Sequence, residues 1–326
     1  MQDKWNEMER TVKGRVSSVA SVTLALGLML LTTGCTITLA PMAKHTAAFS
    51  QATAVIVDRS EDAYRSAIEL HRKEEIAKAV RAFNNDPSWN PYTALDHPLL
   101  TQDQLDARIK VLDALKVYAQ SLVALTDTKK QYAPLGTAAT AAGTNLQALS
   151  TAATPDLQKL FPSATAMTAG DAKGVSTALA GLGALLINNE VHKALPKVTQ
   201  EMNPNIQTLC TLIDSDVKIL RRQADVDYQS LITDENQVIL HNQIDPALRR
   251  AEIGKMIEMV SQQQANDALL VKLQKAIVTL ALTHQALAAA AQGNNPESIK
   301  EHVVDLVNAG QELGSYYKSL PSGSSN

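Results

Sequence analysis

Aromatic residues are scarce in this chain of 326 residues, which bears on its fold class. Phe, Tyr and Trp together make up 4% of the sequence, and stretches in which β-branched residues alternate with polar ones are rare. Strands are normally enriched in both kinds of residue. The residues that dominate instead, Ala and Leu above all, are strong helix formers. The composition therefore predicts an all-α protein.

The chain also has few cysteines and a net charge close to zero. Only Cys35 and Cys210 are present, too few for a framework of disulfides. Cys210 falls in an apolar row of a predicted helix, so we expect it to be a buried structural thiol. The 30 basic and 33 acidic residues give a net charge of −3, which predicts no general affinity for nucleic acid.

Motifs for catalysis, cofactors and metals are also missing. The sequence contains no HExxH or HxxxH pair and no cluster of Cys and His, and it lacks the GxxxxGK[ST] and GxGxxG spacings of nucleotide-binding loops. His284 lies in an apolar row, where a buried histidine bonded to a facing side chain is expected. His45, His71, His192 and His302 lie on predicted helices with polar neighbours, and no pairing among them is predicted. We therefore predict no catalytic residue, no cofactor and no metal site.

One polar row has two interpretations. Asp227, Leu231, Asp234, Val238 and His241 continue the apolar row of their helix in register, and two acids and a histidine on one stripe can meet a metal ion. The alternative is a shift of the heptad, after which the acids face water. The buried side is then taken by Tyr228, Ile232 and Ile239. We favour this second interpretation because no ligand motif supports the first.

The N-terminal region has the layout of a secretory signal. Three basic residues within 10–15 precede an apolar run from Val16 to Thr33, and small residues follow. The sequence Leu31-Thr32-Thr33-Gly34-Cys35 resembles the lipobox of bacterial lipoproteins, although the family's usual Leu three places before the Cys is Thr32 here. The resemblance implies cleavage before Cys35 and lipid attachment to Cys35. An uncleaved transmembrane anchor is the alternative, since the run is long enough to span a bilayer.

The same resemblance implies where the protein resides. The body would lie in the bacterial cell envelope, held to a membrane by the N-terminal lipid. Thr36 follows the cysteine, whereas an Asp at this place usually keeps Gram-negative lipoproteins on the inner membrane. Thr36 therefore favours the outer membrane, facing the periplasm.

The chain divides into four predicted parts. Residues 1–34 form the signal peptide, 35–42 the lipid anchor with a short linker, 43–320 the helical domain, and 321–326 a disordered polar tail. Residues 133–170, rich in Ala, Thr, Gly and Pro, are a candidate hinge within the helical domain.

Helix starts are marked by a recurring pair, a short polar residue followed by proline, which is favoured at the first helical position. The pairs are Thr154-Pro155, Asn203-Pro204, Asp245-Pro246 and Asn295-Pro296. Thr101 with Gln104 adds a capping box. The expected helices cover 43–83, 102–126, 137–151, 171–201 with a kink at Pro196, 204–242, 246–292 and 296–319.

Apolar residues recur in alternating steps of four and three along the last three helices, as in coiled coils. The rows are Ile206, Cys210, Ile213, Val217, Leu220 and Ala224; Leu270, Leu273, Ile277, Leu280, His284, Leu287 and Ala291; and Ile299, Val303, Leu306, Gly310, Leu313 and Tyr317. Short connections require antiparallel neighbours. The expected fold is an elongated antiparallel up-down bundle of long helices with coiled-coil-like seams.

The loop from Asn84 to Leu100 contains three prolines and the candidate partner-binding residues Trp89, Tyr92 and His97. Long loops with exposed aromatics often bind partners. Alternatively, Trp89 and Tyr92 fold back over the end of the bundle.

These observations favour a non-enzymatic scaffold or binding module in the cell envelope, whose partner is a protein or another envelope component. The alternative is a membrane-acting protein. The apolar segment Gly174–Ile187 loosely resembles the head segment of α-helical pore-forming toxins, but it is shorter than the roughly 20 residues that span a bilayer.

Overall fold

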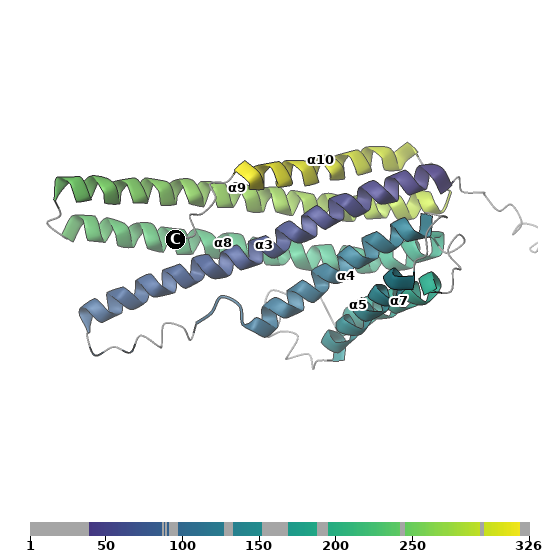
Figure 1. Cartoon of the computed structure of the whole chain (residues 1–326), viewed down its shortest axis with the longest axis horizontal. Helices are drawn as coiled ribbons and strands as arrows, with labels where there is room; N and C mark the ends of the chain where they lie inside the picture. The colour runs from purple at the N-terminus through teal and green to yellow at the C-terminus, as the bar shows by residue number, and fades with distance from the viewer. Residues whose placement is uncertain are drawn as a thin grey trace, which may run out of the picture. The chain divides into compact units, whose positions relative to one another are not determined.

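Helices make up nearly all of the residues that the computed structural model describes, namely 39–86, 88, 90, 97–126, 133–151, 169–187, 195–241, 245–293 and 297–319. The helices are α3 (Leu39–Asn85), α4 (Gln102–Thr126), α5 (Ala133–Thr151), α7 (Ala169–Ile187), α8 (Leu195–His241), α9 (Pro246–Ala291) and α10 (Glu297–Ser319). No strand occurs among the described residues, and the helices pack on one another as a bundle (Figure 1). The all-α prediction is confirmed.

The chain divides after Thr38, so the described residues belong to the unit Leu39–Asn326. The unit that precedes it contains the predicted signal peptide and Cys35, which lie outside the described residues. Both the signal and the lipid attachment stay predictions.

Five of the described helices have clear relative directions: α3, α8 and α10 run one way, and α4 and α9 run the opposite way. Contacts between α8 and α9 keep an antiparallel register, from Asn203 with His284 at one end to Asp225 with Gln263 further along. α9 and α10 are also antiparallel, as are α3 and α4. α3 and α8 are parallel instead: Tyr64 contacts Asp216 near their middle, and later residues of α3 contact later residues of α8. Figure 1 shows α8 and α9 side by side over most of their length.

The predicted apolar rows form the core. Every described member of the three rows is buried, and Ile206, Val217, Leu273, Leu280 and Leu306 have no measurable exposure. The side chain of Tyr317 lies outside the described residues. A helix with one apolar stripe gains free energy by removing that stripe from water, so the periodicity of four and three identifies the buried faces correctly.

Close backbone approach joins α5 to α7. A Cβ atom on Gly183 of α7 would lie 2.7 Å from the carbonyl oxygen of Gly136, and one on Gly143 of α5 would lie 2.8 Å from that of Ser176. Both distances are too short for a side chain, so glycine sets the separation of the two helices. Gly181, by contrast, has nothing within 4 Å of such an atom.

The largest differences from the predicted helices lie at Pro196 and at Pro204. The fourth expected helix is two elements: α7 ends at Ile187 and α8 begins at Leu195, so Pro196 lies in the first turn of α8 and no helix kinks there. Pro204 does not start a helix but lies inside α8. The buried residues Val198, Met202 and Ile206 form one continuous apolar row past Pro204. Their burial offsets the roughly 3 kcal/mol that proline costs in a helix.

Two of the predicted helix-start signals are present in the described residues, and a glycine that was not predicted ends one helix. The Asp245 side chain accepts a hydrogen bond of 2.7 Å from the backbone of Ala247, at the start of α9. Thr101 and Gln104 bond reciprocally as a capping box before α4. Gly293 follows α9 with a φ of 89°, a left-handed conformation that favours glycine. The two predicted signals place the starts of α4 and α9 correctly.

Candidate functional site

Polar side chains line the interface between the parallel helices α3 and α8, which is buried from Tyr64 to Glu74 and partly exposed at Arg81. The contacts, in order along the helices, are Tyr64 with Asp216, His71 with Asp227, Glu74 with Ser230, and Arg81 with Asp234. Buried polar groups are costly unless they are paired. This interface is therefore where chemistry or ligand binding can reside, and its two main clusters are described in turn.

The first cluster joins three helices through a buried ion pair. Arg108 of α4 lies with Nε 2.9 Å from Oδ2 of Asp216 and with Nη2 3.1 Å from Oδ1. The Tyr64 hydroxyl donates to the same carboxylate at 3.2 Å, and burial raises the Tyr64 pKa well above its ordinary value. The Arg108 guanidinium also lies 5.8 Å from the centre of the Tyr64 ring. These groups provide one another's hydrogen-bond and charge partners, so the cluster links α3, α4 and α8.

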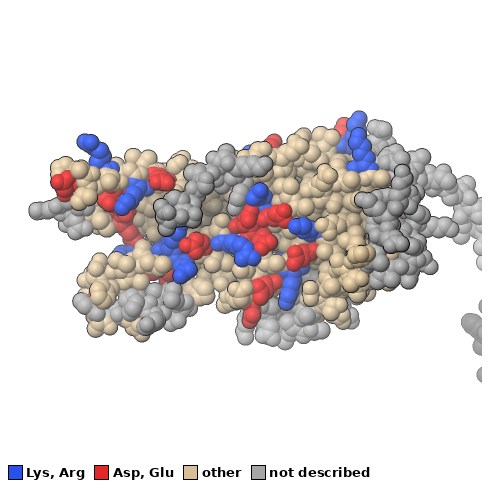
Figure 2. Space-filling view, viewed as in Figure 1, with Lys and Arg blue, Asp and Glu red and all other residues tan. Residues whose placement is uncertain are grey.

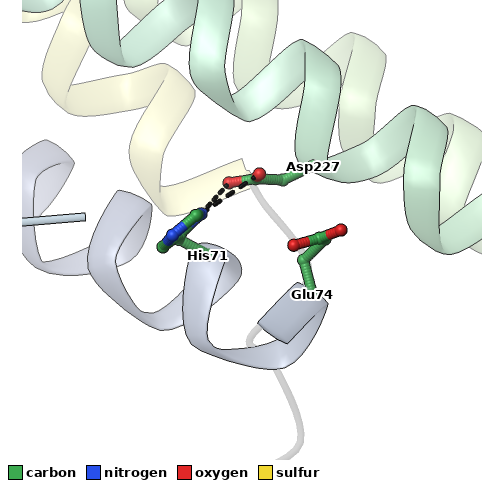
Figure 3. Close-up of side chains that lie close together, drawn as sticks. All are labelled: His71, Glu74 and Asp227. Atoms are coloured by element: carbon green, nitrogen blue, oxygen red, sulfur yellow. Dashed lines mark hydrogen bonds and ion pairs between the residues drawn. The ribbon is translucent and has the colours of Figure 1, made fainter. Parts of the chain in front are cut away.

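The second cluster, which we call the His71 cluster, consists of His71, Glu74, Glu75 and Lys78 on α3 and Asp227 on α8. Asp227 and Glu74 are each 1% exposed. His71 Nδ1 lies 3.2 Å from both carboxylate oxygens of Asp227. Figure 3 shows His71 and Glu74 rising from one helix and Asp227 from the other, with their polar ends turned toward a common space.

The tautomer of His71 follows from its second contact. Its Nε2 lies 3.1 Å from the backbone carbonyl oxygen of His97. A carbonyl oxygen only accepts hydrogen bonds, so Nε2 carries a proton and donates it. The lone pair of a neutral Nδ1 would then face the negative carboxylate of Asp227. A proton or another cation between these two groups makes the contact attractive.

The acidic residues of the cluster have further partners. Lys78 Nζ lies 2.8 Å from Glu74 Oε2 and 2.8 Å from Glu75 Oε1, and the hydrogen bond to Glu74 is the main reason that its pKa is raised. The Ser230 hydroxyl donates to Glu74 Oε1 at 2.7 Å. The Gln223 amide donates to Asp227 Oδ1 at 2.8 Å. These bonds hold the carboxylates in fixed orientations.

His71, Glu74 and Asp227 form a group of side chains that could hold a metal ion. One ligand atom from each lies within 4.8 Å of the others. Two ligand atoms that each lie about 2.1 Å from one ion, with an angle of 90–110° at the ion, are roughly 3.0–3.4 Å apart. The 3.2 Å between His71 Nδ1 and the Asp227 carboxylate oxygen fits this range.

The prediction that Asp227 faces water is wrong, because it turns toward α3. Asp234 likewise pairs with Arg81, and the His241 side chain lies outside the described residues.

A second buried polar network surrounds His284 on α9. Its Nε2 lies 2.6 Å from the Tyr118 hydroxyl, and its Nδ1 lies 3.0 Å from Oδ1 of Asn203. Burial lowers the His284 pKa to about 3, so the ring is neutral at neutral pH. The amide oxygen of Asn203 only accepts, so Nδ1 donates to it and Nε2 accepts from Tyr118. The prediction of a buried histidine bonded to facing side chains is confirmed.

The remaining predicted residues have different outcomes. Cys210 is 3% exposed, and burial raises its pKa to about 12, which confirms the structural thiol. Trp89 and Tyr92 lie outside the described residues, so neither interpretation of the loop is tested. His97 is exposed, and its contact with His71 uses the backbone carbonyl.

The sequence interpretation missed His71 as a site residue. The signal that could have found it is His71-x-x-Glu74, since residues three apart share one face of a helix, combined with a buried acid in another helix. Periodicity marks a buried face without saying which helix it meets, so the pairing of α3 with α8 could not be inferred.

Apolar residues also lie exposed on the outer faces of α8 and α9. The outer row of α8 consists of Ile219, Val226 and Leu240, and the outer row of α9 of Ile253, Ile257, Val260, Val271, Val278 and Leu282. Ile257 is 64% exposed and Leu240 is 67% exposed. Ile219 and Val226 are seven residues apart, and Leu240 follows after fourteen more. Residues spaced by multiples of seven lie along one face of a helix, here on the side opposite the core.

Charged side chains of both signs intermingle over the face shown in Figure 2. Among the described residues, charged side chains of opposite sign often pair, as in Arg65 with Glu61 at 2.7 Å and Lys116 with Asp58 at 2.8 Å. No large area of one sign appears on this face. Such a surface lacks the single-sign potential that attracts nucleic acid.

None of the described helices combines the length and the apolar character of a membrane-spanning helix. In comparisons with known proteins, no family model, no curated protein and no solved structure matches the chain.

Proposed function

We propose that this chain is a non-enzymatic binding module of the bacterial cell envelope, tethered by lipid on Cys35 and facing the periplasm from the outer membrane. The tether is supported by the lipobox-like sequence that ends in Cys35. The binding role is supported by the outer rows of α8 and α9. The mixture of acidic and basic side chains on the face shown in Figure 2 fits a protein partner better than a nucleic acid.

The outer rows are the observation that carries the binding role. Val271 lies two residues before Leu273, which has no measurable exposure, so the two residues are about 200° apart around α9. Ile253, Ile257 and Val260 follow one another in steps of four and three, yet they are 40%, 64% and 37% exposed. A second seam on the solvent side of a helix favours docking of an additional helix. The expected partner is therefore a protein that supplies an amphipathic helix.

Position-specific photo-crosslinking in the native envelope tests the docking surface. A photo-reactive amino acid at Ile257 or at Val226 should give a discrete protein adduct, and one at the exposed Glu301 of α10 should give none. The adduct from Val226 should disappear when Ile253 and Val260 are both replaced by Lys, with the melting temperature unchanged. Equal capture from position 301, or capture that survives the double replacement, would contradict the proposal. An adduct of twice the chain mass would identify a second copy as the partner.

The lipid tether is tested separately. Labelled palmitate should enter the wild-type chain and not a Cys35→Ser variant, and the mature chain should lack residues 1–34 by mass. Label that persists in the variant would exclude Cys35 as the attachment site. An unlabelled chain that retains its N-terminus in the membrane fraction would indicate the transmembrane anchor instead.

Membrane action by Gly174–Ile187 is the alternative. Leu179, Leu182 and Leu186 of this segment are at most 1% exposed, and Gly183 fits closely against α5. Insertion would require α7 to leave these contacts, which favours the binding module. Leakage of dye from liposomes on addition of the protein would reverse this preference.

A further inference from the structure

We propose that His71, Glu74 and Asp227 bind one divalent first-row transition-metal ion such as Zn²⁺, and that this ion joins α3 to α8. The proposal does not depend on the binding role of the outer rows. It rests on the convergence of the three side chains, on the orientation of the histidine and on the charge of the cluster.

The first step is the number and kind of ligands. His71 supplies an imidazole nitrogen, and Glu74 and Asp227 supply carboxylate oxygens, all within 4.8 Å of one another. Three protein ligands of this kind bind Zn²⁺ with one position left for solvent or an external ligand. An imidazole nitrogen is a poor ligand for Ca²⁺ and Mg²⁺, which prefer oxygen. The ligand set therefore selects a transition metal.

The second step is the orientation of His71. Its Nε2 donates to the His97 carbonyl oxygen at 3.1 Å, which turns Nδ1 toward Asp227. Histidines that bind metals usually donate their other ring N–H to a backbone carbonyl or a carboxylate, because this contact fixes the tautomer and the ring plane. The His97 carbonyl provides that support from outside the ligand set. Gln223 and Ser230 similarly hold Asp227 and Glu74.

The third step is the charge. The His71 cluster contains three carboxylates, of which two are 1% exposed, and one lysine, Lys78. With His71 neutral, the cluster carries two negative charges in excess. Buried charge without compensation is costly, and a divalent cation neutralises this excess. Lys78 contacts Glu74 at Oε2, but a carboxylate has about four acceptor positions, so the lysine and an ion can both be accommodated.

Titration of the purified full chain with Zn²⁺ alone tests the proposal. A Cys35→Ser background removes the one thiol besides the buried Cys210 that can bind zinc. Calorimetry should show one ion per chain with micromolar or tighter affinity, whereas Ca²⁺ and Mg²⁺ should bind far more weakly. Co²⁺ in place of Zn²⁺ should give visible absorption bands of a site with nitrogen and oxygen ligands. At about 100-fold excess over the dissociation constant, Zn²⁺ should raise the melting temperature by roughly 5 °C.

Matched variants assign the site. His71→Gln and Asp227→Asn should each weaken Zn²⁺ binding by about 100-fold or more, whereas His302→Gln, which removes an exposed histidine on α10, should leave it unchanged. Helix content and melting without metal show whether each variant is folded. Absence of a one-to-one site in the background chain would overturn the proposal whatever the variants do. It would also fall if His71→Gln left the affinity unchanged, if His302→Gln abolished binding, or if Ca²⁺ bound as tightly as Zn²⁺.

Discussion

The hydroxyl of Tyr118 lies 2.6 Å from Nε2 of His284, and neither side chain has measurable exposure. The other ring nitrogen, Nδ1, donates a hydrogen bond of 3.0 Å to Oδ1 of Asn203. The neutral ring is thus bonded on both sides, and an added proton would have to be accommodated without solvent. This relationship makes the stability of the bundle sensitive to mildly acidic pH.

Stability should fall as the pH drops below about 6.5. Burial lowers the His284 pKa to about 3 in the folded chain, whereas the unfolded chain binds the proton near pH 6.5. The stabilisation is therefore fully present above pH 6.5 and is lost progressively between 6.5 and 3. Between pH 7 and pH 5 this one residue should lower the free energy of unfolding by about 2 kcal/mol.

Urea unfolding at the two pH values measures this effect. In a His284→Gln variant the difference between pH 7 and pH 5 should shrink by about 2 kcal/mol, even though the variant is less stable at both. Identical pH dependence in the two chains would show that another group is responsible.

Removing one partner of the ion pair between Arg108 and Asp216 should destabilise the bundle strongly. Each side chain is about 4% exposed, so Arg108→Met would leave a buried carboxylate without its cation. The expected loss in the free energy of unfolding is about 3–5 kcal/mol. Tyr64→Phe removes one hydrogen bond to the same carboxylate and should cost about 1 kcal/mol. A loss of comparable size in the two variants would contradict the dominance of the ion pair.

Two glycines of α7 should respond oppositely to alanine. Gly183→Ala places a Cβ against the backbone of α5 and should cost about 1–3 kcal/mol. Gly181→Ala meets nothing within 4 Å and should stabilise the helix by up to about 1 kcal/mol, because alanine is the better helix former. Thermal melting of the pair provides its own control, and a stabilised Gly183→Ala would show that α5 and α7 are not closely packed.

Cys210 should be inert toward thiol reagents while the chain is folded. Burial raises its pKa to about 12, and the thiolate is the reactive form. In a Cys35→Ser background, a maleimide should label nothing at neutral pH under native conditions and one thiol per chain in denaturant. Rapid native labelling would mean that α8 opens readily at this position.

The buried faces of the helices could be predicted from the sequence, and their mutual pairing could not. The rows through Ile206 and Leu273 are buried as predicted, because a period of four and three leaves one face apolar regardless of what it meets. The meeting of His71 with Asp227 depends on α3 lying parallel to α8, and no local pattern encodes that choice.

The pairs Asn203-Pro204 and Asp245-Pro246 show the same limit at shorter range. Asp245 caps α9 as predicted, whereas Asn203 lies within α8 and uses its amide oxygen for His284. A short polar side chain before proline can serve either purpose. The outcome for Asn203 is decided by a histidine that lies far along the chain, and the continuous apolar row keeps the helix intact past the proline.

The parallel pairing of α3 with α8 also constrains the order of folding. Tyr64 and Asp216 are separated by 152 residues of sequence, and His71 and Asp227 by 156. α3 is synthesised first among the described helices, yet the partners of its buried polar groups emerge only after α4, α5 and α7. Closing so long a loop is entropically costly and slow. Tyr64 and His71 of α3 therefore have to wait for α8 before they meet their carboxylate partners, so the interface of α3 with α8 should form later than the interfaces between helices that are neighbours in sequence.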